Sequence, residues 1–196
     1  MKEHVHFKGD DDSDRWARQH AEQGERREPE LAPATQALLH AIHVKPGCRV
    51  LDVACGAGDT TAAAEAAGAE AMGIDTSRAI IRIAKERFPG PLFEEGNMVS
   101  PPAGPWDGII CRLGAHHADP TWLAAAYSEL KPGGRLAIAE RDAVDHESRA
   151  NGMKSLGEWM ELLKTAGFQD IKANPTAAKL GGRIYIISGR KPRGHP

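Results

Sequence analysis

The sequence predicts an α/β fold with a doubly wound, mostly parallel sheet, and three observations lead to this prediction. Short apolar runs alternate with amphipathic stretches of about ten residues from residue 47 onward. The first apolar run ends in the loop Gly56-Ala57-Gly58, which is typical of a strand-to-helix turn in such sheets. The last two apolar runs have no helix between them, which indicates an antiparallel hairpin at one edge.

The first elements differ in composition from the rest of the chain. Charged and polar side chains dominate residues 1–30, and Ser13 is placed to cap a helix that carries Trp16 and His20. Residues 33–44 have apolar side chains at helical spacing, which predicts a second helix.

These two helices suggest a boundary near residue 45. We expect residues 1–45 to form an N-terminal helical arm or lid on a domain of residues 46–196. Residues 9–29 should be the most mobile part of this arm. Trp16 and His20 fit either a lid over a ligand or the helix face that packs on the domain.

Each later element has a local reason. Strands are expected where apolar runs are short, at 49–54, 71–74, 92–93, 106–111, 135–139, 168–172 and 183–188. Helices are expected at 60–67, 77–88, 120–130 and 156–165. The first of these helices is rich in alanine, and the second alternates apolar and charged faces. Residues 131–134, Lys-Pro-Gly-Gly, predict a turn, and Gly167 ends the last helix.

Composition excludes several functional classes. The 25 basic and 27 acidic side chains leave a formal charge of −2, which argues against a dedicated nucleic-acid partner. No apolar run is long enough to span a membrane, and residues 1–14 lack the apolar core of a signal peptide. Cys48, Cys55 and Cys111 fit no zinc spacing, so no metal site is expected. Because the cysteines are few and odd in number, a reducing cytoplasm is the simplest location to expect.

The glycine loop indicates a ligand site at the end of the first strand. Gly56 and Gly58 permit close backbone approach, and Asp75, at the end of the second strand, is suited to accept both hydroxyls of a ribose. A dinucleotide site would have a third glycine where Thr61 stands. Asp52 would repel a pyrophosphate, whereas it suits a ligand that bears an amino group.

Six segments together resemble the class I S-adenosylmethionine-dependent methyltransferases. They are VLDVACGAG (50–58), GIDTS (73–77), EEGNM (94–98), WDGIICRLGAHH (106–117), LKPGGRLAIAE (130–140) and LLKTAGFQDI (162–171). The stretch CRLGAHHADP (111–120) resembles the ubiquinone/menaquinone-biosynthesis-like branch, methyltransferase type 11. The resemblance implies a Rossmann-like, seven-stranded sheet with an antiparallel final strand. It also implies S-adenosyl-L-methionine as cofactor and S-adenosyl-L-homocysteine as product.

The resemblance also assigns roles to cofactor-binding residues. Asp52 would hold the methionine amino group, directly or through water, and Asp75 would bind the ribose. The backbone lining would come from Ala54, Gly56 and Gly58. The adenine would lie beside Thr76, Ser77, Asn97 and Met98, and the methionine part over Cys111, Arg112 and Leu113.

The sequence departs from the family in two places. Asn97 stands where an Asp is usual, which keeps a carbonyl acceptor but loses the charge. Only residues 141–154 separate the fifth strand from the next helix, where relatives often insert a longer substrate cover. The substrate site is then open, or is completed by the arm or by a partner subunit in a homodimer.

Two histidines and a charged triplet follow the strands that should carry the chemistry. His116 or His117 is suited to act as a general base, with His117 slightly favoured because it lies further along the loop. A structural role is the alternative for either histidine. Glu140, Arg141 and Asp142 either orient a polar substrate or form a solvated charge cluster.

The sequence therefore predicts an S-adenosylmethionine-dependent methyltransferase that acts on oxygen, nitrogen or carbon of a small-molecule acceptor. One alternative is a non-catalytic protein that keeps the cofactor fold for binding or regulation. A nicotinamide-dependent oxidoreductase is disfavoured by the missing third glycine. A nucleic-acid methyltransferase is disfavoured because Ser100-Pro101-Pro102-Ala103 is not its usual Asn/Asp-Pro-Pro-aromatic motif.

Overall fold

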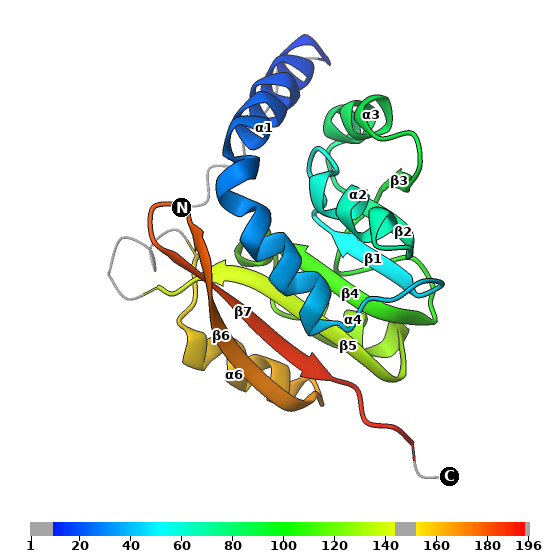
Figure 1. Cartoon of the computed structure of the whole chain (residues 1–196), viewed down its shortest axis with the longest axis vertical. Coiled ribbons are helices and arrows are strands. Elements are labelled where there is room, and N and C mark those ends of the chain that lie inside the picture. Colours follow the sequence, from blue (N-terminus) through cyan, green and yellow to red (C-terminus); the bar gives the residue numbers. More distant parts are fainter. Residues whose placement is uncertain (1–9, 144–151, 195–196) are drawn as a thin grey trace.

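The computed structural model describes residues 10–143 and 152–194 (Figure 1), which form a seven-stranded α/β sheet as predicted. The strands are β1 (Arg49–Val53), β2 (Glu70–Asp75), β3 (Leu92–Glu95), β4 (Trp106–Arg112), β5 (Leu130–Arg141), β6 (Gln169–Lys179) and β7 (Arg183–Arg190). The helices are α1 (Asp10–Ala41), α2 (Asp59–Ala66), α3 (Arg78–Arg87), α4 (Trp122–Glu129) and α6 (Leu156–Thr165), and a 3-10 turn, η1 (Ala115–His117), follows β4.

The strand order is β3-β2-β1-β4-β5-β7-β6. β1 to β5 pair in parallel, and β7 runs antiparallel between β5 and β6, which confirms the predicted antiparallel final strand. The chain order reverses between β1 and β4. The carboxyl ends of these two strands are therefore the expected place for a ligand in a doubly wound sheet.

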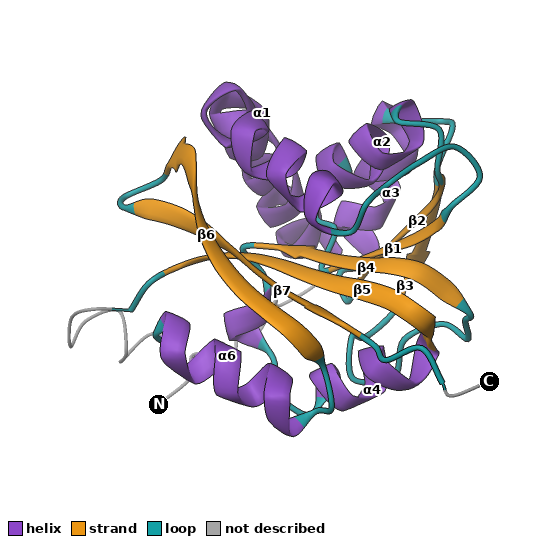
Figure 2. Ribbon diagram, turned by 60° about the horizontal axis from the view of Figure 1, so that its bottom comes forward, coloured by secondary structure: helices purple, strands orange, loops and turns teal. Residues whose placement is uncertain are grey.

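Helices cover both faces of the sheet and bury a separate apolar cluster on each (Figure 2). α1, α2 and α3 lie on one face, and α4 and α6 lie on the other. Successive strand residues point to opposite faces, so Ile109 packs in the cluster of Trp122 and Trp159. Its neighbour Ile110 packs in the cluster of Leu38. Both isoleucines are fully buried, which ties the position of the β4 end to both helical layers.

The N-terminal region differs from the prediction of two helices. α1 is one helix of 32 residues that contains Pro29 and Pro33, and it changes direction near its middle (Figure 1). Each proline removes a backbone donor and crowds the preceding turn, which bends the helix. Burial of Leu31 and Leu38 against the sheet on the later part of the helix offsets this cost. No described helix, α1 included, is long and apolar enough to cross a membrane.

Two strands, β5 and β6, extend far beyond their predicted ranges. β5 begins at Leu130 and includes the segment that was expected to be a turn, because Gly133 and Gly134 exchange backbone hydrogen bonds with Lys191. β6 continues to Lys179 because β7 provides pairing partners along that length. In both places the neighbouring strand determines how long β5 or β6 becomes. The sequence of one strand alone does not indicate where its pairing with another strand ends.

Candidate functional site

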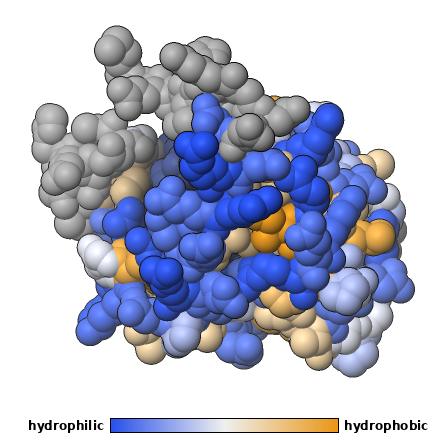
Figure 3. Space-filling model, turned by 90° about the horizontal axis from the view of Figure 1, so that it is seen from above, coloured by the Kyte–Doolittle hydropathy of each residue, from blue (hydrophilic) through white to orange (hydrophobic). Residues whose placement is uncertain are grey.

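A cavity of about 710 Å³ lies over the carboxyl ends of β1, β2 and β4, and we refer to it as the first cavity. Residues of α1, of the glycine loop and of the loops after β2, β3 and β4 line it: Trp16, His20, Ala54, Gly56, Asp75, Thr76, Gly96, Asn97, Met98, Val99, Leu113, Gly114, His117, Ala118 and Asp119. Seen from above, the molecule has apolar surface enclosed between hydrophilic side chains (Figure 3).

Asp75 is held in the wall of this cavity by two backbone donors. The Gly56 N–H donates to Oδ2 at 3.1 Å and the Ser77 N–H donates to Oδ1 at 3.0 Å. Ser77, rather than Asp75, caps α3, because its Oγ accepts the Ile80 N–H at 3.3 Å. Each carboxylate oxygen keeps a further lone pair, so Asp75 can accept two hydroxyl groups from a ligand.

Asp52 lies beneath the glycine loop and does not line the cavity. It is 1% exposed, and its Oδ2 accepts the Thr61 hydroxyl at 2.7 Å. Its Oδ1 is buried without a hydrogen-bond partner. Burial raises the pKa of Asp52 to about 7, although the Thr61 hydrogen bond opposes this rise. A buried acceptor without a partner is costly, so this atom suits a donor that arrives with a ligand or a bridging water.

The glycine loop serves both packing and access. Gly56, at φ +54°, lines the first cavity, and Ala54 adopts a similar positive φ of 56° beside it. Gly58 is buried away from the cavity, at φ +92°, and a Cβ there would lie 2.7 Å from the Phe93 ring. Because Gly58 has no side chain, the glycine loop and the start of α2 can pack closely against Phe93. Gly56 instead leaves space for a ligand.

The predicted adenine side of the site is present as a loop after β3. Met98 is buried and Asn97 is exposed, and both line the first cavity. The Asn97 side-chain oxygen accepts the Val99 N–H at 3.1 Å, which fixes a turn. The Asn97 side chain therefore fixes this turn, and its amide NH₂ is left for a ligand. Thr76 lines the same cavity and is exposed.

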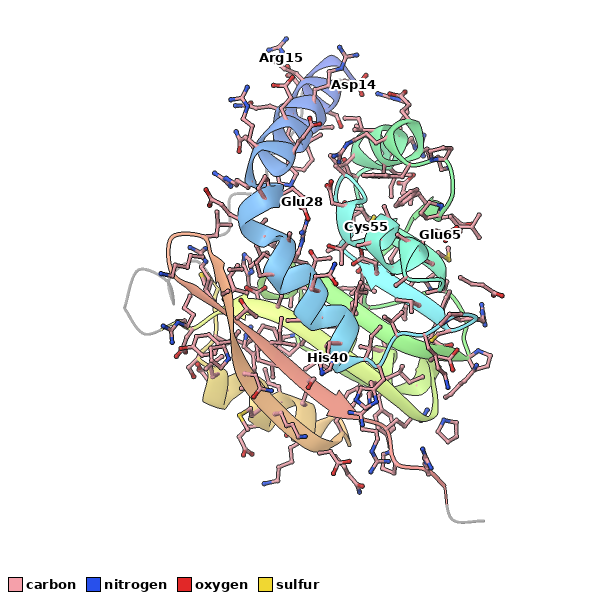
Figure 4. All side chains as sticks on the ribbon, in the orientation of Figure 1. Asp14, Arg15, Glu28, His40, Cys55 and Glu65 are labelled. Carbon is pink, nitrogen blue, oxygen red and sulfur yellow. The ribbon has the colours of Figure 1, made fainter. Side chains whose placement is uncertain are left out.

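A second cavity of about 250 Å³ lies between α1 and the ends of β4 and β5. It shares His20, Gly56 and Leu113 with the first cavity. Its other lining residues are Gln23, Gly24, Arg27, Leu31, Cys55, Ala57, Asp59, Arg112, His116, Arg141 and Leu180. Figure 4 shows α1, with Glu28, facing the loop that carries Cys55. Burial raises the pKa of the Cys55 thiol, so this cysteine is not a ready nucleophile.

The two histidines have different surroundings. His116 lines the second cavity, and its Nδ1 lies 2.8 Å from Oε1 of Glu140, a carboxylate that is 1% exposed. His117 is exposed and lines the first cavity, with its ring centroid 3.9 Å from that of His116. Because an ionised carboxylate can only accept hydrogen bonds, Glu140 favours the form of His116 that carries its proton on Nδ1. Nε2 is then the basic nitrogen of the ring.

Arg112 and residues 140–142, at the end of β5, have different surroundings. Arg112 lines the second cavity, but its guanidinium is bound to Glu28 and Thr35 of α1 rather than left for a ligand. Arg141 lines the same cavity, and Asp142 accepts the Leu156 N–H. The short cover of residues 141–154 falls largely on residues 144–151, which lie outside the described part of the chain.

The structure brings most of the predicted cofactor residues to one place, and it adds others. Ala54, Gly56, Asp75, Thr76, Asn97 and Met98 share the first cavity, whereas Asp52, Gly58 and Cys111 lie behind its wall. Sequence reasoning missed Arg27 and Leu180, which have no motif around them. It also missed the contact between His116, in the 3-10 turn after β4, and Glu140, on β5, which are 24 residues apart.

Comparisons with known proteins agree with this geometry. The profile of the methyltransferase domain family matches residues 50–134. The chain is 32% identical to a demethylmenaquinone methyltransferase of Beutenbergia cavernae over 54% of its own length and 45% of that protein. It is 34% identical to a ribosomal protein L11 methyltransferase of Thermus thermophilus over 65% of its length and 57% of that protein.

A solved structure shows the same fold over nearly the whole chain. Human N-acetylserotonin methyltransferase, in complex with S-adenosylmethionine, superposes with a TM-score of 0.70 at 19% identity, over 95% of this chain and 57% of that one. The chain spans about half the length of the curated relatives that it matches. Residues 50–134 thus carry the sequence pattern of the methyltransferase domain family, and about half of the chain is similar to demethylmenaquinone methyltransferases.

Proposed function

We propose that this protein transfers a methyl group from S-adenosylmethionine to oxygen, nitrogen or carbon of a small-molecule acceptor. The observation that carries the proposal is the placement of Asp75, whose carboxylate is fixed by Gly56 and Ser77 in the wall of the first cavity. This is an acceptor pair for a ribose at the end of β2. The family match supports the same cofactor.

The residues present fit this cofactor in charge as well as shape. The unpartnered Oδ1 of Asp52 suits the amino group of the methionine part, reached directly or through water. Asn97 and Met98 would flank the adenine edge, and Gly56 would lie against the middle of the ligand. When bound, S-adenosylmethionine supplies a methyl group on a positively charged sulfur, with a neutral thioether as leaving group.

The protein's own contribution to the reaction is to hold the acceptor in line and to take up its proton. Alignment of reacting atoms lowers the barrier by up to ~7–11 kcal/mol in ideal systems. His116, oriented by the buried Glu140, is better arranged as the general base than His117. In this proposal His116 accepts the proton of the acceptor's nucleophilic group, and Glu140 is a positioning residue that stabilises the charged ring.

The size of the site favours a small acceptor over a protein. The relatives are named for a menaquinone precursor and for a ribosomal protein, so the family includes both classes. Here the second cavity, of about 250 Å³, adjoins the first and is partly covered by α1. Its volume suits a small molecule next to the transferred methyl group.

Calorimetry tests the cofactor assignment. S-adenosylhomocysteine should bind the protein in the micromolar range, and reduced nicotinamide dinucleotides should not. Asp75→Ala should weaken this binding by about 1–3 kcal/mol, because charged hydrogen bonds to the ribose are lost. Glu86→Ala, which removes an exposed carboxylate of α3, is the matched control. Equal affinity in both variants would remove Asp75 from the cofactor site.

A further inference from the structure

The second cavity has an unusual charge distribution for a site beside a cationic cofactor. Three arginines from three different elements line it: Arg27 of α1, Arg112 at the end of β4 and Arg141 at the end of β5. Asp59 is the only carboxylate of a described residue in its lining. The net charge that these four side chains present to the cavity depends on which of them already form ion pairs within the protein.

Two of the four charges are neutralised within the protein. Arg112 forms a two-point ion pair with Glu28 at 2.8 Å. Asp59 forms a two-point ion pair with Arg87 at 2.8 and 2.9 Å. Arg27 and Arg141 form no ion pair with any described residue. The lining of the cavity therefore includes two positive charges that no described side chain neutralises, one on α1 and one at the end of β5.

Arg141 is held in place although its charge is not neutralised. Its Nη2 lies 3.6 Å from the Met153 sulfur, which is a weak acceptor. Gly181, in the turn between β6 and β7, approaches so closely that a Cβ there would lie 3.3 Å from Nη1. The pairing of Arg141 with Ile184 fixes its backbone in the sheet. A positioned, partly buried guanidinium is preorganised for a planar oxyanion, which it can bind through two hydrogen bonds.

The same cavity contains the proposed base. His116 lies in the wall with Arg141, and Gly56 and Leu113 connect this space to the first cavity. Taking methyl transfer as the function, we propose that the acceptor carries an oxyanion, a carboxylate or a phosphate, and that Arg141 and Arg27 bind it. The anion then anchors the acceptor with its nucleophilic atom between His116 and the methyl group.

The experiment measures anion binding to the protein saturated with S-adenosylhomocysteine. Citrate and inorganic phosphate are titrated by calorimetry, with succinate and its uncharged analogue succinamide as a matched pair. At least one oxyanion should bind, and succinamide should not. Which of carboxylate and phosphate binds more tightly identifies the group on the acceptor.

Variants locate the anion. Arg141→Gln should weaken anion binding at least ~10-fold, about 1.4 kcal/mol, and Arg27→Gln should weaken it less because Arg27 is more exposed. Arg26→Gln is the matched control, since Arg26 is the neighbouring exposed arginine of α1 and lines neither cavity. Arg141→Lys, which keeps the charge, should bind with intermediate affinity and serves if Arg141→Gln fails to fold.

Three results would overturn the inference. The first is that no oxyanion binds the complex of the protein with S-adenosylhomocysteine. The second is that the Arg141→Gln and Arg26→Gln variants bind the oxyanion with equal affinity. The third is that Arg141→Gln weakens the binding of S-adenosylhomocysteine but not that of methylthioadenosine, which lacks the amino-acid part. The third result would assign Arg141 to the methionine carboxylate. Failure of the parent to bind S-adenosylhomocysteine at all would instead contradict the proposed function.

Discussion

Arg112 at the end of β4 forms a two-point ion pair with Glu28 in the middle of α1, with N–O distances of 2.8 Å. The Thr35 hydroxyl accepts a further hydrogen bond from the same guanidinium at 2.7 Å. This contact ties the bent part of the N-terminal helix to the end of β4, where the sequence places the methionine part of the cofactor only as an expectation. Arg112 therefore connects the arm to the end of β4 beside the second cavity, and its charge is already paired with Glu28.

Glu28→Gln should destabilise the protein by about 1–3 kcal/mol. The substitution leaves a largely buried guanidinium without its carboxylate, and the partial exposure of Glu28 limits the loss. Urea unfolding measures the change. Glu30→Gln, an exposed carboxylate two residues further along α1, should change stability little, and an equal loss in both variants would show that the ion pair contributes nothing specific.

The pH dependence of stability should carry the signature of Asp52. Burial raises its pKa from the ordinary 3.8 to about 7. Between these values the folded protein keeps a proton that the unfolded chain releases, so stability falls as pH rises from about 4 to about 7. Asp52→Asn, which preserves an oxygen for Thr61, removes this loss. The variant should gain stability over the parent at pH 8 by up to about 4 kcal/mol, and little at pH 4.

Unfolding in urea across this pH range measures the effect of Asp52. Glu86→Gln, on the surface of α3, should follow the parent's pH profile throughout. A constant difference between Asp52→Asn and the parent from pH 4 to pH 8 would mean that Asp52 does not titrate in this window.

Cofactor binding should also depend on the protonation of Asp52. A cationic amino group favours the ionised carboxylate, so Asp52 must release its proton when S-adenosylhomocysteine binds below pH 7. Affinity should fall as pH drops from 7 to 5, with proton release visible as a buffer-dependent heat in calorimetry. Asp52→Asn should bind more weakly and show no such heat from this residue. Proton release that persists in the variant would assign it to another group.

His116 should matter more for the chemical step than His117. Once an acceptor that the protein methylates is in hand, His116→Asn should lower the single-turnover rate by about 10²–10⁴-fold. The affinity for S-adenosylhomocysteine should stay nearly constant. Glu140→Gln should also lower this rate, because Glu140 positions the His116 ring and stabilises its charge. His117→Asn, the adjacent matched control, should stay within a factor of a few. Thermal unfolding separates these effects from loss of structure. Parent-like rates in all three variants would leave alignment as the source of catalysis.

The first part of α1 should become more protected when the cofactor product binds. Trp16 and His20 line the first cavity, so a ligand there contacts both the helix and the glycine loop. Hydrogen exchange of residues 10–29 should slow on addition of S-adenosylhomocysteine, while α6, on the far face of the sheet, should exchange as before. Unchanged exchange of residues 10–29 would make this part of α1 a passive extension.

The sequence predicted the sheet because its signals are local. Alternating apolar runs and helical stripes determine where β1 to β4 and α2 to α4 lie, within a few residues. The motifs around Gly56 and Asp75 indicated the place of the first cavity for the same reason, since a turn and a strand end are read from neighbouring residues. The single long α1 was missed because Pro29 and Pro33 indicate a helix boundary locally, and only the buried contacts of Leu38 and its neighbours keep the helix continuous.

The sequence by itself determined the fold class, the order of the strands along the chain and the residues that surround Asp75. Tertiary structure alone decided that Arg112 meets Glu28, that His116 meets Glu140, and that Arg141 and Arg27 line one cavity. These pairs are separated by 24 to 114 residues, and charged side chains carry no periodic signal of their partners. Their meeting follows from sheet pairing and helix packing, which bring the ends of β4 and β5 beneath α1.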